Sequence, residues 1–503
     1  MDHADTAQLA AVLGALGAAL VLLARTRSPL LAGFALLGCA EAGLIWSLSG
    51  AGGSDLAVGP LELAAGAAGL VLLALGVAAL VRWPATITPL VLAAAPFRLP
   101  IDVDPDARFF LSVAGSGELG RLLPLYGVLG AACLALIVRV VRGRAVPTLP
   151  LFAALPAAAF TAFAALSLLW TRDLEAGTTT LAFFLLPFTA LVAVVARAPF
   201  PAWLPRVLAV LAIALATLFA LIGLWQALTR ELLFAAPNLE VANTYAPIFR
   251  VTSLFRDPSL YGRHVVLGIG VVVVAVWLRR IPALPALALI ALLWGGLYFS
   301  YSQSSLAALF AAVLAIGAIA GSRGVRKAVA AAAAVLLLVG SALVVHEALD
   351  TSVRRATSDR SRRVELTARV LADHPVAGVG IGSQPFASQQ LSERSGPKPN
   401  FVSHATPVTV GAELGLIGLL AYAALLVAAA FLIEAVRRRD AALGLTLAAT
   451  LLALFVHALF YSGFFEDPIT WLVLAIAAGY LVSRDQAAEQ VATIGPSPDP
   501  ALT

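Results

Sequence analysis

The chain has 503 residues, 61% of them hydrophobic and only 12% charged, whereas charged residues make up about 25% of an ordinary soluble domain. This composition excludes a water-soluble protein and indicates an integral membrane protein. The net charge of +5 does not indicate nucleic-acid binding, because the basic residues are spread along the chain and no polar domain gathers them. The two cysteines, Cys39 and Cys133, lie within apolar runs, so the sequence predicts no disulfide framework.

Mostly apolar runs recur from end to end of the chain. As an α-helix, a run of roughly eighteen such residues is long enough to cross a hydrocarbon core of about 30 Å. The sequence therefore predicts an all-α, polytopic transmembrane helical bundle with about 12–15 spans. The expected spans are 7–24, 29–49, 60–81, 84–98, 121–138, 148–170, 174–196, 204–228, 258–278, 282–300, 302–321, 327–346, 406–434, 440–463 and 467–483. The segment 84–98 is short and carries three prolines, so we expect it to be re-entrant or broken.

The basic residues predict how the spans are oriented. They occur in short groups with room for two spans between consecutive groups, which is the pattern of cytoplasmic loops under the positive-inside rule. These groups are Arg25 and Arg27; Arg82; Arg139, Arg142 and Arg144; Arg197 and Arg206; Arg279 and Arg280; Arg323, Arg326 and Lys327; Arg437 to Arg439; and Arg484. The rule places the N-terminus outside, together with the polar stretches 99–120, 171–173, 229–257 and 347–405.

The chain divides into five parts on this basis. They are N-terminal spans (1–248), core spans (249–346), one large outer loop with short helices (347–405), C-terminal spans (406–483) and a cytoplasmic tail (484–503). The tail is polar and contains prolines, with nothing apolar to bury, so we expect it to be disordered.

Arginines gather in two of the outer stretches. The large loop carries Arg354, Arg355, Arg360, Arg362, Arg363 and Arg369, and the other stretch carries Arg250 and Arg256, with Arg263 and His264 where the next span begins. The positive-inside rule disfavours arginine on the outer side, so these side chains are expected to meet anions there. The alternative is charge that is simply solvated.

Several motifs in this part of the chain resemble the O-antigen ligase and polymerase superfamily of membrane glycosyltransferases. In order they are RVTSLFRDPSLYG, YFSYSQSSLAALFA, RRVELTARVLADHPVAGVGIG and SHATPVTVGAELGLIGLL, followed by HALFYSGFFEDPITWLVL in the closing spans. The resemblance runs from Phe249 to the last span, and it rests on the order and spacing of motifs that are individually weak. It implies a bundle like those of the C-type membrane glycosyltransferases.

The family's first loop motif is an arginine, an amphipathic helix and a Pro-x-x-Gly-x-Gly turn. Here it corresponds to Arg363, the helix to Asp373, and then Pro375, Gly378, Gly380 and Gly382. The glycines permit tight turns and let the backbone approach a phosphate. A turn that only returns the chain to the membrane explains them as well.

The second loop motif is a histidine followed at fixed spacing by a glutamate and a glycine, which here are His404, Glu413 and Gly415. Family members usually have asparagine after this histidine and an aromatic residue two further on, whereas this chain has Ala405 and Pro407. An unpaired carboxylate inside an apolar helix is unfavourable, so Glu413 is expected to have a partner. A catalytic role and a structural hydrogen bond to loop backbone both remain open for it.

The SYSQSS motif departs from the family in charge. Many members carry an arginine after its small polar residues, and the resemblance implies that this arginine faces the lipid diphosphate, but this chain has Gln303, Ser304 and Ser305. The positive charge must then come from elsewhere. The candidates are Arg250, Arg256 and Arg263, or Arg362 beside Arg363. The alternative for these serines is helix packing, which small residues favour in membranes.

The resemblance implies glycan transfer from an undecaprenyl-diphosphate-linked donor to a hydroxyl of a glycan or glycolipid acceptor. The reaction would be inverting and metal-independent, with no cofactor, on the extracytoplasmic face of a bacterial cytoplasmic membrane. Arg363 and its neighbours would stabilise the leaving diphosphate, and His404 would activate or place the acceptor hydroxyl. Ligase and polymerase differ in the acceptor, which the motifs do not decide.

Two rival interpretations remain. The acids Asp102, Asp104 and Asp106 have a spacing that suits a divalent cation, as in other polyprenyl-phosphate-sugar transferases, although a solvated turn explains them too. A transporter of lipid-linked oligosaccharides is the other rival. Its coupling groups would be sought among Glu41, His457, Glu466 and Asp467.

Overall fold

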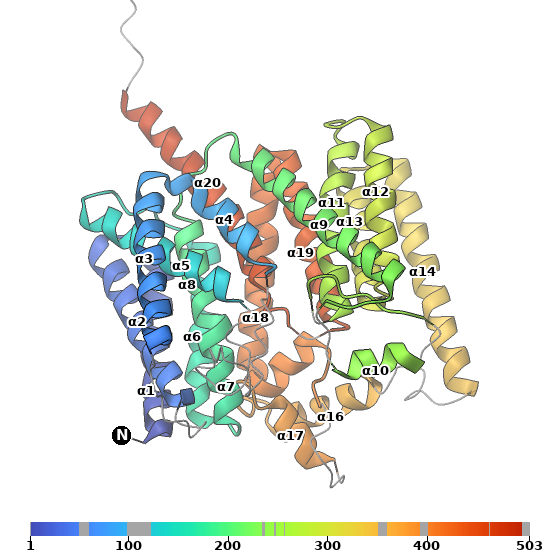
Figure 1. Ribbon diagram of the computed structural model, residues 1–503, viewed down its shortest axis with the longest axis horizontal. Helices are drawn as coiled ribbons and strands as arrows, with labels where there is room; N and C mark the ends of the chain where they lie inside the picture. Colours follow the sequence, from blue (N-terminus) through green and yellow to red (C-terminus); the bar gives the residue numbers. More distant parts are fainter. Residues whose placement is uncertain are drawn as a thin grey trace, which may run out of the picture.

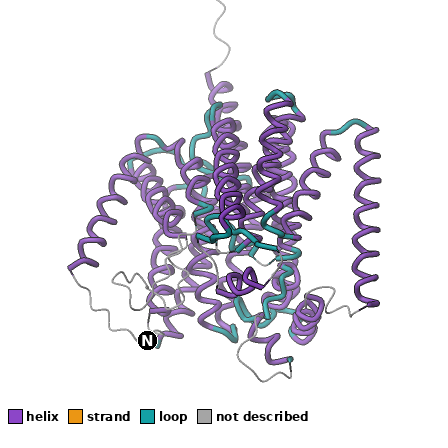
Figure 2. Tube along the Cα trace, turned by 45° about the vertical axis from the view of Figure 1, so that its right-hand side comes forward, coloured by secondary structure: helices purple, strands orange, loops and turns teal. Residues whose placement is uncertain are grey.

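The structure, a computed structural model, describes residues 2–49, 60–97, 122–233, 237–245, 248–255, 257–350, 360–392, 401–461 and 463–494. All the regular secondary structure of these residues is helical, as Figure 2 shows. The long apolar runs fold as helices because in a membrane each backbone N–H and C=O must find its partner within the segment.

The helices form three groups across the bundle (Figure 1). The first comprises α1 (His3–Leu23), α2 (Arg27–Ser49), α3 (Pro60–Arg82), α4 (Ile87–Ala94), α5 (Leu123–Val141), α6 (Leu151–Leu166), α7 (Leu174–Thr180) and α8 (Leu186–Val195). The second comprises α9 (Leu204–Thr229), α11 (Pro258–Trp277), α12 (Ala283–Tyr298), α13 (Gln303–Ala320) and α14 (Arg323–Asp350). Between them stand α18 (Thr406–Arg439), α19 (Ala441–Ala458) and α20 (Pro468–Ile494).

Short helices lie outside the long ones or extend them. The polar stretches carry α10 (Pro237–Tyr245), α16 (Arg360–Asp373) and α17 (Gln384–Leu391). A 3₁₀ turn at Ser167–Trp170 extends α6, and a π-helical turn at Leu181–Leu185 joins α7 to α8. Two of these short helices, α16 and α17, therefore lie within the large loop.

The structure confirms a polytopic helical membrane protein. Among the described residues, ten helices are each long and apolar enough to cross a membrane. The segment that the sequence marks as broken is a 3₁₀ turn at Pro84–Thr86 followed by α4, bent by 111° from α3. Because α4 has only eight residues, which rise about 12 Å, it is too short to cross alone.

Two hydrophobic clusters hold the bundle together, and α19 belongs to both. The first cluster joins the first group of helices to α18, α19 and α20, and the second joins α9, α11, α12 and α13. Leu447 and Leu454 of α19 pack in the first cluster, whereas Leu445 and Ala449 pack in the second. This helix therefore positions the two halves of the bundle against each other.

The two ends of the bundle differ in chemistry. At one end, which we call the arginine end, Nη2 of Arg27 donates to the carbonyl of Gly143 at 2.7 Å. Arg197 donates at the same end to the carbonyl oxygens of Ala24 at 3.3 Å and Pro147 at 3.1 Å. The other end, which we call the loop end, carries α10, α16 and α17 (Figure 1).

The sequence prediction about the C-terminal tail is wrong for its first part. We expected disorder after Arg484, but α20 continues beyond it to Ile494, and residues 495–503 lie outside the described residues. Alanine, glutamine and glutamate dominate this stretch and favour helix strongly. Near the start of this extension, Asp485 forms an ion pair with Arg439 at 3.0 Å.

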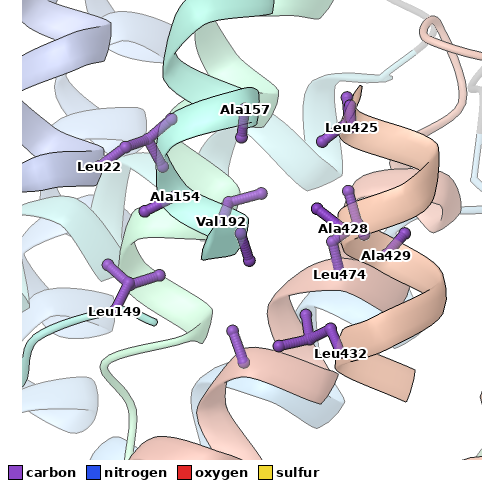
Figure 3. A pocket seen from close by; sticks show the side chains of 12 residues that line it. Leu22, Leu149, Ala154, Ala157, Val192, Leu425, Ala428, Ala429, Leu432 and Leu474 are labelled. Atoms are coloured by element: carbon purple, nitrogen blue, oxygen red, sulfur yellow. The ribbon is translucent and has the colours of Figure 1, made fainter. Parts of the chain in front are cut away.

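A small cavity between α1, α6, α8, α18 and α20 is lined by apolar side chains alone (Figure 3). Its lining includes Leu22, Leu149 and Leu432, and the first two neighbour the Ala24 and Pro147 carbonyls that Arg197 contacts. The cavity thus lies toward the arginine end, away from the large loop. It offers no polar group for chemistry.

Candidate active site

Arg363 and His404, which the two loop motifs single out separately, meet at the loop end. Nη1 of Arg363, on α16, lies 2.8 Å from Nε2 of His404, which stands just before α18. A guanidinium can only donate, so Nε2 accepts this hydrogen bond and the ring proton is on Nδ1. His404 has a φ of 56°, a left-handed conformation that is uncommon outside glycine and concentrates at functional sites.

The surroundings of His404 keep its ring neutral. Burial, and then the positive charges of Arg363 and Arg360, lower the pKa of His404 to about 4, against a smaller raising effect of Asp257. Asp257 comes from the loop that precedes α11, so two of the polar stretches converge on this histidine. The ring of Tyr461, after α19, lies 6.2 Å from the His404 ring between centroids.

The arginines at the start of α16 form a cluster of positive charge. Burial and the charge of Arg363 lower the pKa of Arg360, and Arg362 lies partly exposed between the two. Like charges this close repel one another, so an anion bound beside them would relieve the repulsion. Glu365, which follows these arginines on α16, forms its ion pair with Arg369 instead.

The glycine turn after α16 packs against a break in α18. Gly415 has φ 62° and ψ −161°, a combination that is essentially restricted to glycine. A Cβ on Gly415 would come within 2.3 Å of the Val376 carbonyl oxygen, and one on Gly378 would come equally close to the backbone of Glu413. These glycines serve close backbone packing between the turn after α16 and α18.

Glu413 fastens the large loop to α18. Its carboxylate accepts a hydrogen bond from the backbone N–H of Gln384 at 3.2 Å, and its carbonyl accepts one from Gly380 at 2.9 Å. The side chain is 9% exposed. The sequence predicts a partner for the Glu413 carboxylate. In the structure this partner is the backbone N–H of Gln384 in the large loop.

The start of α13 lies against α11 and α19 through a set of buried hydroxyls. Ser304 Oγ lies 3.2 Å from Nε2 of His457, and that nitrogen lies 3.2 Å from the Ser259 carbonyl. Because a carbonyl only accepts, Nε2 of His457 carries the proton. The His457 ring also lies 5.3 Å from the Tyr461 ring, so Tyr461 stands between the two histidines.

Ser305, in the motif where the resemblance leads us to expect an arginine, lies in a tightly packed position. Ser305 is fully buried and donates to the Ser259 carbonyl at 3.2 Å. A Cβ on Gly262 of α11 would come within 2.6 Å of Ser305 Oγ. The serine therefore serves tight helix packing, as small residues do in membranes, whereas Gln303 at the helix start is exposed.

The remaining candidate arginines differ in their surroundings. Nε of Arg250 donates to the carbonyl of Ser300 at 3.3 Å, which places its guanidinium beside the start of α13. Arg263 forms an ion pair with Asp467 at 2.6 Å, with side chains 4% and 2% exposed. Arg256 lies outside the described residues. Arg250 is thus half-buried beside the start of α13, whereas Arg263 belongs to a buried ion pair.

Sequence reasoning missed several residues that shape the site. It named His457 and Asp467 only as possible groups of a carrier, and it gave no role to Asp257, Tyr461 or Gln384. The signal for His457 and Tyr461 was present, because both fall in the closing motif HALFYSG. Their partners lie on other helices, which no local pattern reveals.

The proposed metal ligands Asp102, Asp104 and Asp106 lie outside the described residues. Within the described part of the chain, no three His, Cys, Asp or Glu side chains gather where they would hold a metal ion.

Comparison with known proteins agrees with the motifs. Residues 287–423 match the family model described as O-antigen ligase, and no curated protein matches the chain. The matched stretch runs from α12 into α18 and includes Ser304, Arg363, His404 and Glu413, but it is shorter than the resemblance that begins at Phe249. This match supports membership of the O-antigen ligase superfamily for the part of the chain that it covers.

Proposed function

We propose that this protein is a membrane glycosyltransferase that moves a glycan from a polyprenyl-diphosphate-linked donor to a hydroxyl of a cell-surface acceptor, as an O-antigen ligase does. The donor lipid is undecaprenyl diphosphate, and the site faces away from the cytoplasm of a bacterial inner membrane. The observation that carries the proposal is the hydrogen bond between Arg363 and His404. It joins an anion-binding group to a base beside a membrane surface.

The diphosphate belongs beside the arginine cluster of α16. Guanidinium groups bind phosphate oxygens through paired hydrogen bonds and stabilise the charge that develops as the diphosphate leaves. Arg363 and Arg362 supply these groups, and Arg250 adds a third from beside the start of α13. Gln303, which is exposed, supplies an uncharged hydrogen-bonding group at the same helix start, which itself favours anions. Ser304 is buried and contacts His457, so it supports this helix start from behind.

Donor binding and base activation are coupled through Arg363. As long as Arg363 donates to Nε2 of His404, the only lone pair of this ring is occupied. A diphosphate is a stronger acceptor for the guanidinium, so binding it draws Arg363 away and frees Nε2. The negative charge also offsets Arg363 and Arg360, which raises the pKa of His404 from about 4 toward the range of a useful base.

The transfer then proceeds in one displacement. The acceptor hydroxyl gives its proton to Nε2 of His404, and its oxygen attacks the anomeric carbon opposite the diphosphate. The bond from that carbon to the diphosphate oxygen breaks, and the electron pair leaves with the diphosphate, whose charge Arg363 and Arg362 stabilise. The configuration inverts, and the imidazolium later returns its proton to solvent. No metal or cofactor enters these steps.

A transfer assay in proteoliposomes tests the proposal, with a polyprenyl-diphosphate-linked glycan and several candidate acceptors. His404→Ala and Arg363→Ala are expected to lower turnover by roughly 10²–10⁴-fold. Arg369→Ala is the matched control, because it removes the same charge from an exposed position on the same helix. If both site variants insert normally and turn over like the wild type, the assignment is wrong.

The same assay separates the alternatives. Transfer to a second donor-linked glycan makes the protein a polymerase, and transfer to a different glycolipid makes it a ligase. Full activity in the presence of a chelator rules out a metal site at Asp102, Asp104 and Asp106. Movement of the lipid-linked glycan across the membrane without any transfer would identify a carrier instead and overturn the proposal.

A further inference from the structure

A single buried amide, the side chain of Gln384, connects the segments that carry Arg363 and His404. Gln384 begins α17 and is fully buried. Its Nε2 donates to Thr367 Oγ1 at 2.9 Å and to the Phe401 carbonyl at 3.0 Å, while its Oε1 accepts from the backbone N–H of Ser403 at 3.3 Å.

Each end of the Gln384 amide is linked, through one further residue, to Arg363 or to His404. Thr367 Oγ1 donates to the carbonyl of Arg363 at 2.8 Å, one turn earlier on α16. Ser403 directly precedes His404, and its hydroxyl accepts from the N–H of Ala405 at 3.1 Å. The bridge thus runs from the backbone of Arg363 to the residues on both sides of His404.

The amide is itself held in place. Ser388 Oγ, one turn later on α17, lies 2.8 Å from Nε2 of Gln384. The backbone N–H of Gln384 donates to the carboxylate of Glu413 at 3.2 Å, so α18 fixes the same residue from the other side. Buried networks whose members are all hydrogen-bonded specify one arrangement of the groups around them.

We propose that Gln384 is the positioning residue that sets the distance between Arg363 and His404. This inference rests on the proposed function, because the distance matters for the coupling of diphosphate binding to base activation. Gln384 touches neither donor nor acceptor. It acts through Thr367 on α16 and through Ser403 on the segment that ends at His404.

Loss of the bridge changes a property of His404 that does not depend on turnover. The charged groups that face His404 are Arg363 and Arg360 of α16 and Asp257 before α11, with the Tyr461 ring packed nearby. If α16 and the segment before His404 separate, the effect of both arginines weakens and the ring gains water. The pKa of His404 then rises from about 4 toward its ordinary 6.5.

The test compares Gln384→Met and Thr367→Val with wild type in nanodiscs, after histidine-selective isotope labelling. The chain has six histidines, and His404→Asn identifies the signal of His404. Both variants are expected to raise the pKa of His404, and Gln384→Met to lower kcat/KM roughly 100-fold, as small misplacements of catalytic groups do. The double variant should be no worse than Gln384→Met alone, because both changes cut one bridge.

Gln389→Met is the matched control, since it removes an amide from a partly exposed position of the same helix and should leave the His404 titration and turnover unchanged. An unaltered pKa of His404 in both Gln384→Met and Thr367→Val would overturn the inference, even if activity fell. If Gln384→Met does not fold, the isosteric Thr367→Val decides alone. Wild-type protein without transfer activity would refute the proposed function, but the titration would still test the bridge.

Discussion

Nη1 of Arg363 donates a hydrogen bond to Nε2 of His404 across 2.8 Å, so the one ring nitrogen with a lone pair is already engaged. The two residues come from motifs at opposite ends of the large loop. Their contact makes the state of the histidine depend on what else the arginine binds. This relationship gives the proposed reaction an order, in which the donor binds before the base is released.

The first prediction concerns the pH dependence of glycan transfer. The acid limb of kcat/KM reports the free enzyme, in which the pKa of His404 is about 4, so kcat/KM should stay level from neutral pH down to about pH 5. The acid limb of kcat reports the donor-bound enzyme, in which the diphosphate offsets Arg363. It should therefore lie at a higher pH than the limb of kcat/KM.

Full pH profiles of both constants check this order. Arg363→Gln removes a charge that lowers the pKa of His404, so its kcat/KM limb should move upward toward that of kcat. Arg369 is exposed and paired with Glu365, so Arg369→Gln should shift the acid limb of neither kcat nor kcat/KM. Coincident limbs in the wild type would contradict the exchange of Arg363 between His404 and the diphosphate.

The second prediction concerns the break in α18. Gly415→Ala places a Cβ where the Val376 carbonyl oxygen is only 2.3 Å away, in a conformation that costs a non-glycine residue about 1–3 kcal/mol even without the clash. We expect a lower thermal unfolding temperature and a large loss of transfer, because the turn that Glu413 fastens is displaced. Thermal unfolding in detergent and the transfer assay measure the two effects.

Gly127→Ala is the control for this change. Gly127 lies inside α5, and no atom lies within 4 Å of a Cβ built there. Alanine favours helix over glycine by roughly 1 kcal/mol, so this variant should be as stable as the wild type or more stable. Equal behaviour of the two variants would show that Gly415 has no special backbone role.

Much of the fold follows from local features of the sequence. Hydropathy over a span and the positions of arginines are local, and they predict helices such as α1 and α19 and the broken segment at α4. Polarity alone does not predict disorder in the tail, because the polar residues after Arg484 also have high helix propensity.

The sequence predicted the two halves of the candidate site, but not that they come together. The motifs marked Arg363 and His404, but nothing local states that their side chains meet, since the contact depends on how α16 packs beside α18. The pairing of Arg263 with Asp467 joins residues on two distant helices. Because a contact between distant segments cannot be read from the sequence, the charges of Arg263 and Arg250 did not indicate that Arg263 lies in a buried ion pair.

The third prediction follows from that difference. Arg250 lies beside the start of α13 with its Nε on the Ser300 carbonyl, so Arg250→Ala should weaken donor binding. A lost charged hydrogen bond is worth about 1.5–3 kcal/mol, which corresponds to a roughly 10- to 150-fold higher KM for the donor. The KM for the acceptor should change little.

Arg230→Ala serves as the control, because Arg230 is an exposed arginine at the end of α9. Initial rates over a range of donor concentrations distinguish the two variants. An unchanged donor KM in Arg250→Ala would remove this residue from the diphosphate site.

The last prediction separates stability from binding at the buried ion pair. Arg263 and Asp467 are 4% and 2% exposed and lie 2.6 Å apart, so removing either charge takes the ionic partner of this pair from a buried group. Breaking such a pair costs about 3–5 kcal/mol, whereas replacing both members by apolar groups is often neutral or stabilising. Arg263→Met and Asp467→Leu should each lower the unfolding temperature, and the double variant should recover it.

The exposed pair of Arg369 and Glu365, with side chains 63% and 59% exposed, provides the comparison, since pairs of this kind contribute about 0–1 kcal/mol. Breaking it should leave the unfolding temperature nearly unchanged. A stable Arg263→Met variant with a raised donor KM would instead return Arg263 to the diphosphate site. Recovery of stability in the double variant, with donor KM close to that of the wild type, would assign the pair to holding α11 against α20.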